Sequence, residues 1–179
     1  MKICILSDSH DNRALLARAV EQALEHGIEA IIHCGDVVAP STLSSIRHFG
    51  IPTHVIHGNN TGDLYTMGYI ANKPDSCIHY HGQDARLQLA ARNIFVVHYP
   101  HYAQGMALTG DWDLVCCGHS HKVCIEEVTN IKGNKTCLVN PGSVAGLDGD
   151  PNFILADLQT MSFEVMQVSG AYDAPYFGA

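Results

Sequence analysis

Five short polar motifs, each following an apolar run, carry the side chains in this chain that are best suited to chemistry. They are Asp8-Ser9-His10, Gly35-Asp36, Gly58-Asn59-Asn60, His98 and Gly118-His119-Ser120-His121. Together they offer carboxylate oxygens, amide oxygens and imidazole nitrogens, and no thiolate. This mixture suits an open site for divalent metal better than a closed structural zinc site. We therefore expect two divalent ions, with manganese favoured and iron, zinc or nickel as alternatives.

Asp36 is the carboxylate that we expect to bridge the two ions. It stands alone at the end of the apolar run at residues 30–34, after Gly35, which gives clearance. A shared carboxylate offsets the repulsion between two cations that lie roughly 3.5 to 4 Å apart, and such a pair can hold a hydroxide for in-line attack on a phosphoryl group. Asp36 is therefore the expected catalytic residue, as the ligand that positions the hydroxide.

The apolar runs before these motifs predict the strands that position them, because open α/β sheets bind ligands at the carboxyl ends of their strands. Apolar residues at every fourth position between residues 16 and 24 predict a helix after the first motif. Asn12 is its expected N-cap and Gly27 its expected C-terminal glycine. A second helix is expected at residues 40–49, followed by a third strand. This order predicts a parallel sheet with right-handed crossovers.

The second half of the chain is expected to be built mainly of antiparallel strands. Three short apolar runs predict an antiparallel meander, at residues 77–81, 85–90 and 94–97. A hairpin is expected around residues 130–135, and another around a two-residue turn at Gln159-Thr160. Two mixed sheets stacked face to face, with helices outside, accommodate all of these elements, so the expected fold class is α/β.

Composition narrows the function classes. The chain has 179 residues, 46% of them hydrophobic, which predicts one domain over residues 1–179. Ten Lys and Arg stand against eighteen Asp and Glu, for a net charge of -8, and no basic run is present. This balance argues against extended nucleic-acid binding. No signal peptide is visible and no apolar stretch approaches the roughly twenty residues of a membrane helix, so we expect a soluble cytoplasmic protein.

Cysteine usage and the C-terminal tail leave two points open. Seven cysteines without a C-x-x-C pair predict reduced thiols. The pair Cys116-Cys117 is interpreted as two small residues on opposite faces of a strand, with a redox or metal-binding pair as the alternative. The tail at residues 169–179 has no clear period but carries aromatic residues. It is either loose or docked on a neighbouring subunit of a homo-oligomer.

In order and spacing, the five motifs resemble those of the calcineurin-like metallophosphoesterases. The segment Asn140-Pro141-Gly142-Ser143 is similar to one that is typical of the small single-domain phosphodiesterase branch, and the resemblance spans residues 2 to about 168. It implies a four-layer α/β/β/α sandwich, with that segment as a structural turn beneath the site. The metal ligands implied are Asp8, His10 and His121 for one ion, Asn59, His98 and His119 for the other, and Asp36 for both.

Two departures from the family's pattern bear on the substrate. In many members a His or Cys follows the ligand Asn, and the His form is thought to protonate the leaving oxygen, whereas this chain has Asn60 and Thr61. An amide is no general acid near neutral pH, so Asn60 is expected to hydrogen-bond the phosphate. Substrates with good leaving groups are then favoured, or His101 supplies the proton. Asn12 is a further candidate phosphate contact, with a plain helix cap as the alternative.

The second departure lies after His98, where the family often has His-Gly-His. Here Tyr99 and Pro100 separate His98 from His101. The aromatic ring and the proline predict a stiffer, more apolar pocket wall. Other histidines are expected to be strand or surface residues rather than ligands, namely His33, His54, His57, His79 and His81.

The expected function is hydrolysis of phosphodiesters of a small phosphorylated substrate by attack of a metal-bridging hydroxide, without a covalent intermediate. A dianionic monoester calls for additional positive groups or a proton donor, and few Lys or Arg lie near the motifs. The first alternative is a phosphomonoesterase. The second is a non-catalytic metal-binding scaffold of a protein complex, since one branch that resembles this family serves as a trafficking-complex subunit. Members of that branch have typically lost metal-site histidines, which this chain retains.

Overall fold

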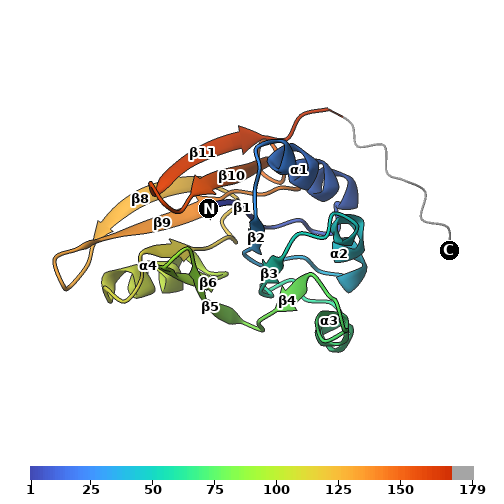
Figure 1. The fold of residues 1–179 in the computed structure, drawn as a ribbon, viewed down its shortest axis with the longest axis horizontal. Coiled ribbons are helices and arrows are strands. Elements are labelled where there is room, and N and C mark those ends of the chain that lie inside the picture. Colours follow the sequence, from blue (N-terminus) through green and yellow to red (C-terminus); the bar gives the residue numbers. More distant parts are fainter. Residues whose placement is uncertain (171–179) are drawn as a thin grey trace.

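The computed structural model describes residues 1–170, which form two mixed β-sheets and four helices (Figure 1). The strands of the first sheet are β1 Lys2–Leu6, β2 Ala30–His33, β3 Thr53–Val55, β4 Ile78–Tyr80, β10 Asn152–Asp157 and β11 Ser162–Gln167. Those of the second sheet are β5 Asp84–Leu89, β6 Arg92–Val97, β7 Leu114–Cys116, β8 Val123–Thr129 and β9 Lys135–Pro141. The helices are α1 Arg13–Glu25, α2 Pro40–Arg47, α3 Leu64–Ala71 and α4 Pro100–Leu108.

The sheet topology places several strand ends at one edge of the molecule. The first sheet has the order β11-β10-β1-β2-β3-β4, with β1 to β4 parallel and β10 and β11 antiparallel. The second has the order β5-β6-β7-β9-β8, with β6, β7 and β9 parallel. Helices connect β1 to β2, β2 to β3, β3 to β4 and β6 to β7, whereas strand β8 lies in the connection between the parallel strands β7 and β9. The carboxyl ends of β1, β2 and β3 therefore lie side by side, as do those of β6 and β7.

The core consists of three apolar layers, which confirms the predicted four-layer sandwich. Ile5 packs between the two sheets, whereas its neighbour Leu6 faces the layer under α1, α2 and α3. A third layer lies between the second sheet and α4. Cys116 faces the other sheet and Cys117 faces α4, so the two thiols lie on opposite faces, as predicted.

The first helix follows its sequence signals closely. The Asn12 side chain accepts a hydrogen bond from the Leu15 backbone N–H at 3.1 Å and caps α1. Gly27 follows the C-cap with φ +75°, a left-handed conformation that glycine adopts without steric cost. Ser169 lies against this helix, because its carbonyl accepts from Arg18 Nε at 2.8 Å. The rest of the tail, residues 171–179, lies outside the described residues, so its docking stays a prediction.

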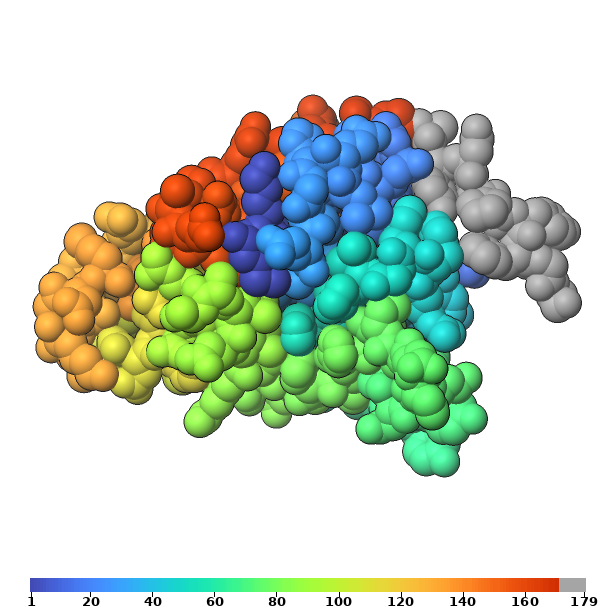
Figure 2. All heavy atoms as spheres, viewed as in Figure 1, coloured from blue at the N-terminus to red at the C-terminus, as the bar shows by residue number. Residues whose placement is uncertain are grey.

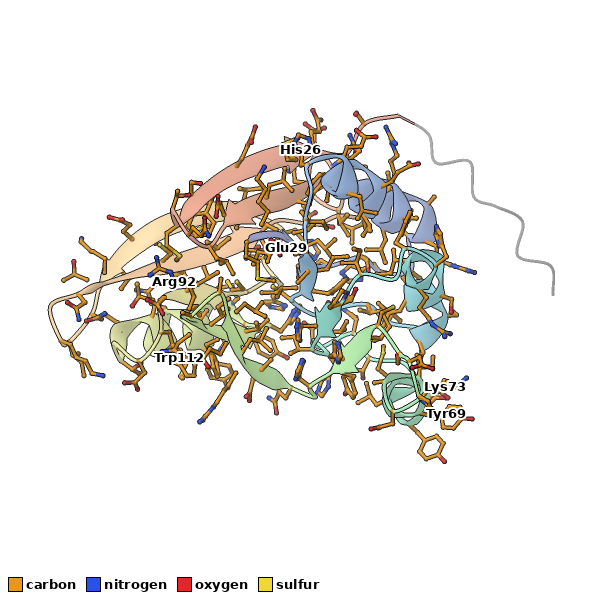
Figure 3. All side chains as sticks on the ribbon, viewed as in Figure 1. His26, Glu29, Tyr69, Lys73, Arg92 and Trp112 are labelled. Carbon is orange, nitrogen blue, oxygen red and sulfur yellow. The ribbon has the colours of Figure 1, made fainter. Side chains whose placement is uncertain are left out.

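Helices α3 and α4 are absent from the sequence prediction. In α3 only Met67 is buried, and Tyr65 and Tyr69 are 85% and 61% exposed. Figure 3 shows Tyr69 beside Lys73, whose ammonium lies 5.0 Å from the centre of the ring. The inner face of α3 carries Leu64, Met67 and Ile70 at helical spacing, but apolar Tyr65 and Tyr69 on the outer face mask that period in the sequence. In the space-filling view, the α3 region and the β8–β9 hairpin project from opposite ends of the molecule (Figure 2).

Two predictions of strand pairing are wrong in detail. The predicted meander does not form, because β4 joins the first sheet parallel to β3, and only β5 and β6 pair antiparallel. The β10–β11 hairpin is present, but its loop has four residues rather than two, since Asp157 pairs with Ser162. Met161 adopts φ +54° in that loop, a left-handed conformation that is more usual for glycine. Within residues 1–170, no helix is long and apolar enough to cross a membrane.

Candidate metal centre

The structure brings together all seven predicted ligands at the strand ends. Backbone hydrogen bonds join the loops that carry them, from Asp8 N–H to the Gly35 carbonyl, from His10 N–H to the Asp36 carbonyl and from Gly118 N–H to the His98 carbonyl, each at 3.0 Å. We call Asp8, His10 and His121 the first half of the cluster, and Asn59, His98 and His119 the second half. Asp36 lies between the two halves.

In the first half, nitrogen and oxygen atoms face one another at distances that fit metal coordination. His121 Nε2 lies 3.4 Å from Asp8 Oδ1, and His10 Nε2 lies 3.5 Å from Asp36 Oδ2 and 3.8 Å from Asp8 Oδ1. Ligand bonds of about 2.1 Å place neighbouring ligand atoms of one ion about 3.0 to 3.4 Å apart. The 3.4 Å distance lies in that range and the 3.5 Å distance is just above it, and both are long for a direct charged hydrogen bond.

Two polar atoms of the first half are buried without a hydrogen-bond partner. They are Asp8 Oδ1 and His10 Nε2. Asp8 is completely buried, and this burial raises the pKa of its carboxyl group above the usual value. Buried polar atoms are nearly always paired in folded proteins, since leaving one unpaired costs about 1 to 3 kcal/mol. A divalent ion would satisfy both atoms, so this half fits a metal.

The second half shows the same requirement through the tautomer of His98. Its Nδ1 donates to the Cys34 carbonyl at 2.8 Å, so in the neutral ring Nε2 carries a lone pair. That lone pair faces Asn59 Oδ1 at 3.1 Å and Asp36 Oδ1 at 3.4 Å, and both of these oxygens are acceptors. The lone pairs of these three atoms repel one another, and a cation placed between them would let all three act as ligands. Asn59 Oδ1 also lies 2.8 Å from His119 Nδ1.

Asp36 is oriented so that each of its oxygens faces one half. Its Oδ2 faces His10 and its Oδ1 faces His98. Asn60 holds this orientation, because its backbone N–H donates to Oδ1 at 2.9 Å and its side-chain amide donates to Oδ2 at 2.6 Å. The carboxylate therefore has the placement expected of a bridging ligand. The Asp8, Asp36 and His98 ligand atoms also lie within 4.8 Å of one another, so the two halves adjoin.

The three predicted substrate contacts lie around this cluster with other partners. Asn60 uses one amide N–H on Asp36, and Asn12 caps α1 through its side-chain oxygen. The His101 ring packs on Tyr102 and Tyr99, with ring centres 4.2 and 5.7 Å away, and it lines a cavity of about 470 Å³ beside α4. Tyr99 in turn contacts the His119 ring at 5.0 Å. Contact of these three residues with substrate stays a prediction.

Five of the seven candidate ligands have a left-handed backbone. Their φ angles lie between +40° and +66°, at Asp8, His10, Asp36, His119 and His121. Such a conformation is unfavourable for a residue with a Cβ atom, at a cost of order 1 to 3 kcal/mol each, and it is concentrated at functional sites. Stability alone does not account for this arrangement. It aims side chains from tight turns at one point.

Two glycines allow the ligand loops to approach this closely. A Cβ atom at Gly58 would overlap Asp36 Oδ1 and would lie 2.7 Å from His98 Nε2. A Cβ atom at Gly118 would overlap Ser7 Oγ and lie 2.7 Å from Asp8 Oδ2. A side chain at either position would displace a ligand.

Sequence reasoning missed one residue that supports the cluster directly. Asp148 Oδ2 lies 2.9 Å from His121 Nδ1, which leaves the His121 Nε2 atom facing Asp8. A carboxylate behind a ligand histidine fixes the tautomer and orientation of the ring. Asp148 stands in an irregular loop between β9 and β10, where no periodic pattern marks it.

The segment Asn140–Ser143 at the end of β9 connects two of the ligand loops from beneath, as predicted for a structural turn. Asn140 Nδ2 donates to the Gly118 carbonyl at 2.7 Å, and Ser143 Oγ donates to the Asp8 carbonyl at 2.9 Å.

Comparison with known proteins gives a family model and several relatives. The model of the calcineurin-like phosphoesterase superfamily domain matches residues 1–173. A curated relative, named phosphodiesterase MJ0936, from Methanocaldococcus jannaschii, is 27% identical over 172 residues, which are 91% of this chain and 96% of the relative.

Solved structures share the fold over nearly their whole length. An archaeal phosphodiesterase superposes with a TM-score of 0.82 at 24% identity, over 93% of this chain and 99% of that one. The phosphoesterase YfcE from E. coli has a TM-score of 0.62 at 16% identity, over 94% and 100% of the two chains. Vacuolar protein sorting 29 from Cryptosporidium parvum has 0.67 at 16%, over 95% and 97%.

Proposed function

Because the chain belongs to the calcineurin-like phosphoesterase superfamily and is a hydrolase of phosphoric esters, we propose that it cleaves phosphodiester bonds of a small substrate at a centre of two divalent metal ions. The residues proposed as ligands are those of the two halves together with Asp36. The curated relative that is named a phosphodiesterase supports the choice of diesters.

The observation that carries this proposal is the arrangement around Asp36. Its two oxygens face different halves, and in each half lone pairs or unpaired buried atoms converge. Two divalent ions bound there would supply positive charge that polarises the phosphoryl oxygen and an activated water as the attacking group. Manganese fits a donor set of carboxylate, amide and imidazole groups, as do iron, zinc and nickel.

The chain's own residues provide positioning. Asn60 holds both oxygens of Asp36, and the Cys34 carbonyl and Asp148 hold the rings of His98 and His121 through their outer nitrogens. The proposed ligands are therefore oriented before substrate arrives. Such preorganisation supplies much of the rate acceleration at catalytic sites. Asn59 and His119 are exposed, so we infer that the phosphoryl group approaches from the side of the second half.

Diesters are favoured over monoesters by the charge around the site. Several basic side chains already bond groups elsewhere, namely Lys2, Arg18, Arg92, Lys132 and Lys135. A dianionic monoester would meet little positive charge besides the metal ions, and Asn60 offers no proton to its leaving group. A diester carries one negative charge and therefore needs less positive charge for binding. The aromatic groups Tyr99 and Tyr102 provide a wall for the alcohol part of the substrate.

The test combines elemental analysis with turnover of bis(p-nitrophenyl) phosphate in added Mn²⁺, for the wild type, Asp36→Asn and the exposed control Asp75→Asn. We expect two metal ions per chain and turnover in both the wild type and the control. Turnover by Asp36→Asn should fall by more than about 100-fold, which exceeds the usual effect of removing a residue that only hydrogen-bonds a metal ligand. Unchanged turnover in Asp36→Asn would refute the assigned chemistry. A higher kcat/KM on p-nitrophenyl phosphate than on the diester would favour the monoesterase alternative.

A further inference from the structure

A second group of imidazoles lies on one face of the first sheet, at its β4 edge. His54 of β3 is directly opposite His79 of β4 in the parallel register, and His81 follows two residues later on the same face. His54 Nδ1 lies 3.0 Å from His81 Nε2. The His54 ring stacks with those of His79 and His81, with centres 5.1 and 5.2 Å away and planes inclined by 25°. None of the three belongs to the metal centre described above.

The distance between the two facing nitrogens suits a shared metal ion. With metal–nitrogen bonds of 2.0 to 2.1 Å, two adjacent ligands of one ion lie about 2.9 Å apart in square geometry and about 3.4 Å apart in tetrahedral geometry. The observed 3.0 Å falls between these limits. In the present pair the N–H of one ring donates a hydrogen bond to the ring nitrogen of the other. Rotation about χ2, a soft torsion for histidine, turns both lone pairs toward a common ion.

These histidines are already in the form that binds metal. Burial, with the neighbouring imidazoles, lowers the pKa of His54 to about 4, and the same causes lower the pKa of His81. Both rings are therefore neutral at pH 7, and no proton must leave before an ion binds. His79 and His81 are exposed, which leaves a path for the ion. His57, two residues after the end of β3, turns elsewhere, with Nδ1 2.6 Å from the Tyr80 hydroxyl.

We propose that His54 and His81 chelate a divalent transition-metal ion of the zinc, nickel or copper class at the β3–β4 edge, with His79 as an outer ligand. The donors are imidazole nitrogens alone, which select these ions over manganese or magnesium. The site is thus chemically different from the centre at the strand ends, which combines carboxylate, amide and imidazole groups. A bound ion would join the edge strand β4 to β3 through side chains as well as through the backbone.

The first experiment counts zinc ions. Wild type, His54→Gln/His81→Gln and the control His26→Gln are dialysed against the same free Zn²⁺ concentration and analysed for metal. Figure 3 shows His26 at the end of α1, far from β3 and β4. We expect one zinc ion fewer per chain in the cluster variant and no change in the control. Equal zinc contents in all three proteins would overturn the proposal.

A second experiment locates the ion and guards against misfolding of the double variant. Cu²⁺ added at low stoichiometry to Asp36→Asn should broaden the side-chain NMR signals of His54 and His81 before that of His26. The single variant His81→Gln, at an exposed position, should abolish this broadening, and His79→Gln should weaken it several-fold. Broadening of His26 at the same Cu²⁺ concentration would contradict the site. Because Asp36→Asn already disrupts the proposed catalytic centre, failure here is independent of the proposed phosphodiesterase function.

Discussion

In the first half of the metal centre, Asp8 and His10 each bury an atom without a partner, whereas in the second half Asn59 Oδ1 lies within 3.1 Å of two imidazole nitrogens. Asp8 is completely buried, but Asn59 and His119 are exposed to solvent. The two halves share Asp36, yet only the first buries atoms that have no hydrogen-bonding group within reach.

From this difference we infer that the two halves bind their metal ions with different affinities. Without a cation the first half retains a buried carboxylate, an unpaired imidazole nitrogen and strained turns at Asp8 and His10, so a bound ion relieves a large cost there. In the second half Asn59 and His119 are exposed, so water can hydrogen-bond to these groups when no ion is bound. We therefore expect the first half to hold its ion more tightly, and the second to lose its ion first on chelation.

The largest effect should follow from Asp8→Asn, which removes the charge that makes the first half costly. We expect kcat/KM on the diester to fall by more than about 100-fold and the tightly held ion to be lost. This effect exceeds the one expected from removing a residue that only hydrogen-bonds a metal ligand. The metal-free variant should unfold at a higher urea concentration than the metal-free wild type, because a buried carboxylate with a raised pKa is gone. Urea titrations in EDTA measure this, and a less stable metal-free variant would contradict the comparison.

Gly58→Ala should damage the second half, because the added Cβ atom lies on the Oδ1 side of Asp36, which faces that half. The added Cβ atom would collide with Asp36 Oδ1 and lie 2.7 Å from His98 Nε2, so the ligands must move apart. We expect kcat/KM to fall by about 100-fold and the metal content to fall from two ions to one. Gly68→Ala is the matched control, since nothing lies within 4 Å of its added Cβ in α3. The control should keep full activity and gain about 0.5 to 1 kcal/mol in unfolding free energy.

These predictions rest on a site that the sequence revealed unevenly. The meeting of the polar motifs was predictable because each ends an apolar run, and parallel strands place their carboxyl ends at one edge. The division of the candidate ligands between two ions came from the resemblance to a known family. Asp148 was not predictable, because it contacts His121 from an irregular loop and only the folded chain brings them together. The role of Asn60 in holding Asp36 was also missed, since an amide next to a ligand reads equally well as a substrate contact.

The fold was predictable to a similar degree. Apolar runs predicted most strands, but a short run such as β4 has the same pattern in either sheet, and its partner is decided by tertiary packing against β3. Helix α4 was missed because Pro100, read as a loop residue, occupies the first position of the helix, where its missing N–H costs nothing. Helix α3 was missed because Tyr65 and Tyr69 on its exposed face mask the helical spacing of Leu64, Met67 and Ile70.

A smaller effect on activity is expected from Asp148→Asn, which weakens support of His121 in the first half. The amide can still accept from Nδ1, but it loses the charge that strengthens the ring as a ligand. We expect the dissociation constant of the tightly held ion to rise by about 10-fold, and kcat/KM at limiting metal to fall in proportion. Asp150→Asn, in the same exposed loop, is the control. Equal metal affinity in both variants would show that the carboxylate does not support the first half.

The smallest effect on turnover, but a clear one on stability, should come from His33 beneath the first half. His33 is completely buried, donates from Nε2 to Ser9 Oγ at 3.0 Å and accepts from Gly35 N–H at Nδ1. Burial lowers its pKa to about 3, whereas the unfolded chain binds a proton near pH 6.5. The unfolded state thus holds more protons between these values, so stability is full above pH 6.5 and declines as the pH falls toward 3.

For His33 this linkage amounts to about 2 kcal/mol of unfolding free energy between pH 7 and pH 5. His33→Gln should cost about 1 to 3 kcal/mol at pH 7, where it disturbs the bonds to Ser9 and Gly35, but its stability should decline less with acid by that 2 kcal/mol. Urea unfolding in EDTA at several pH values measures both slopes without metal release. His26→Gln, at an exposed position, should keep the wild-type slope. If His33→Gln keeps it too, the acid sensitivity of the first half lies in the ligands themselves and not in the buried imidazole that supports them.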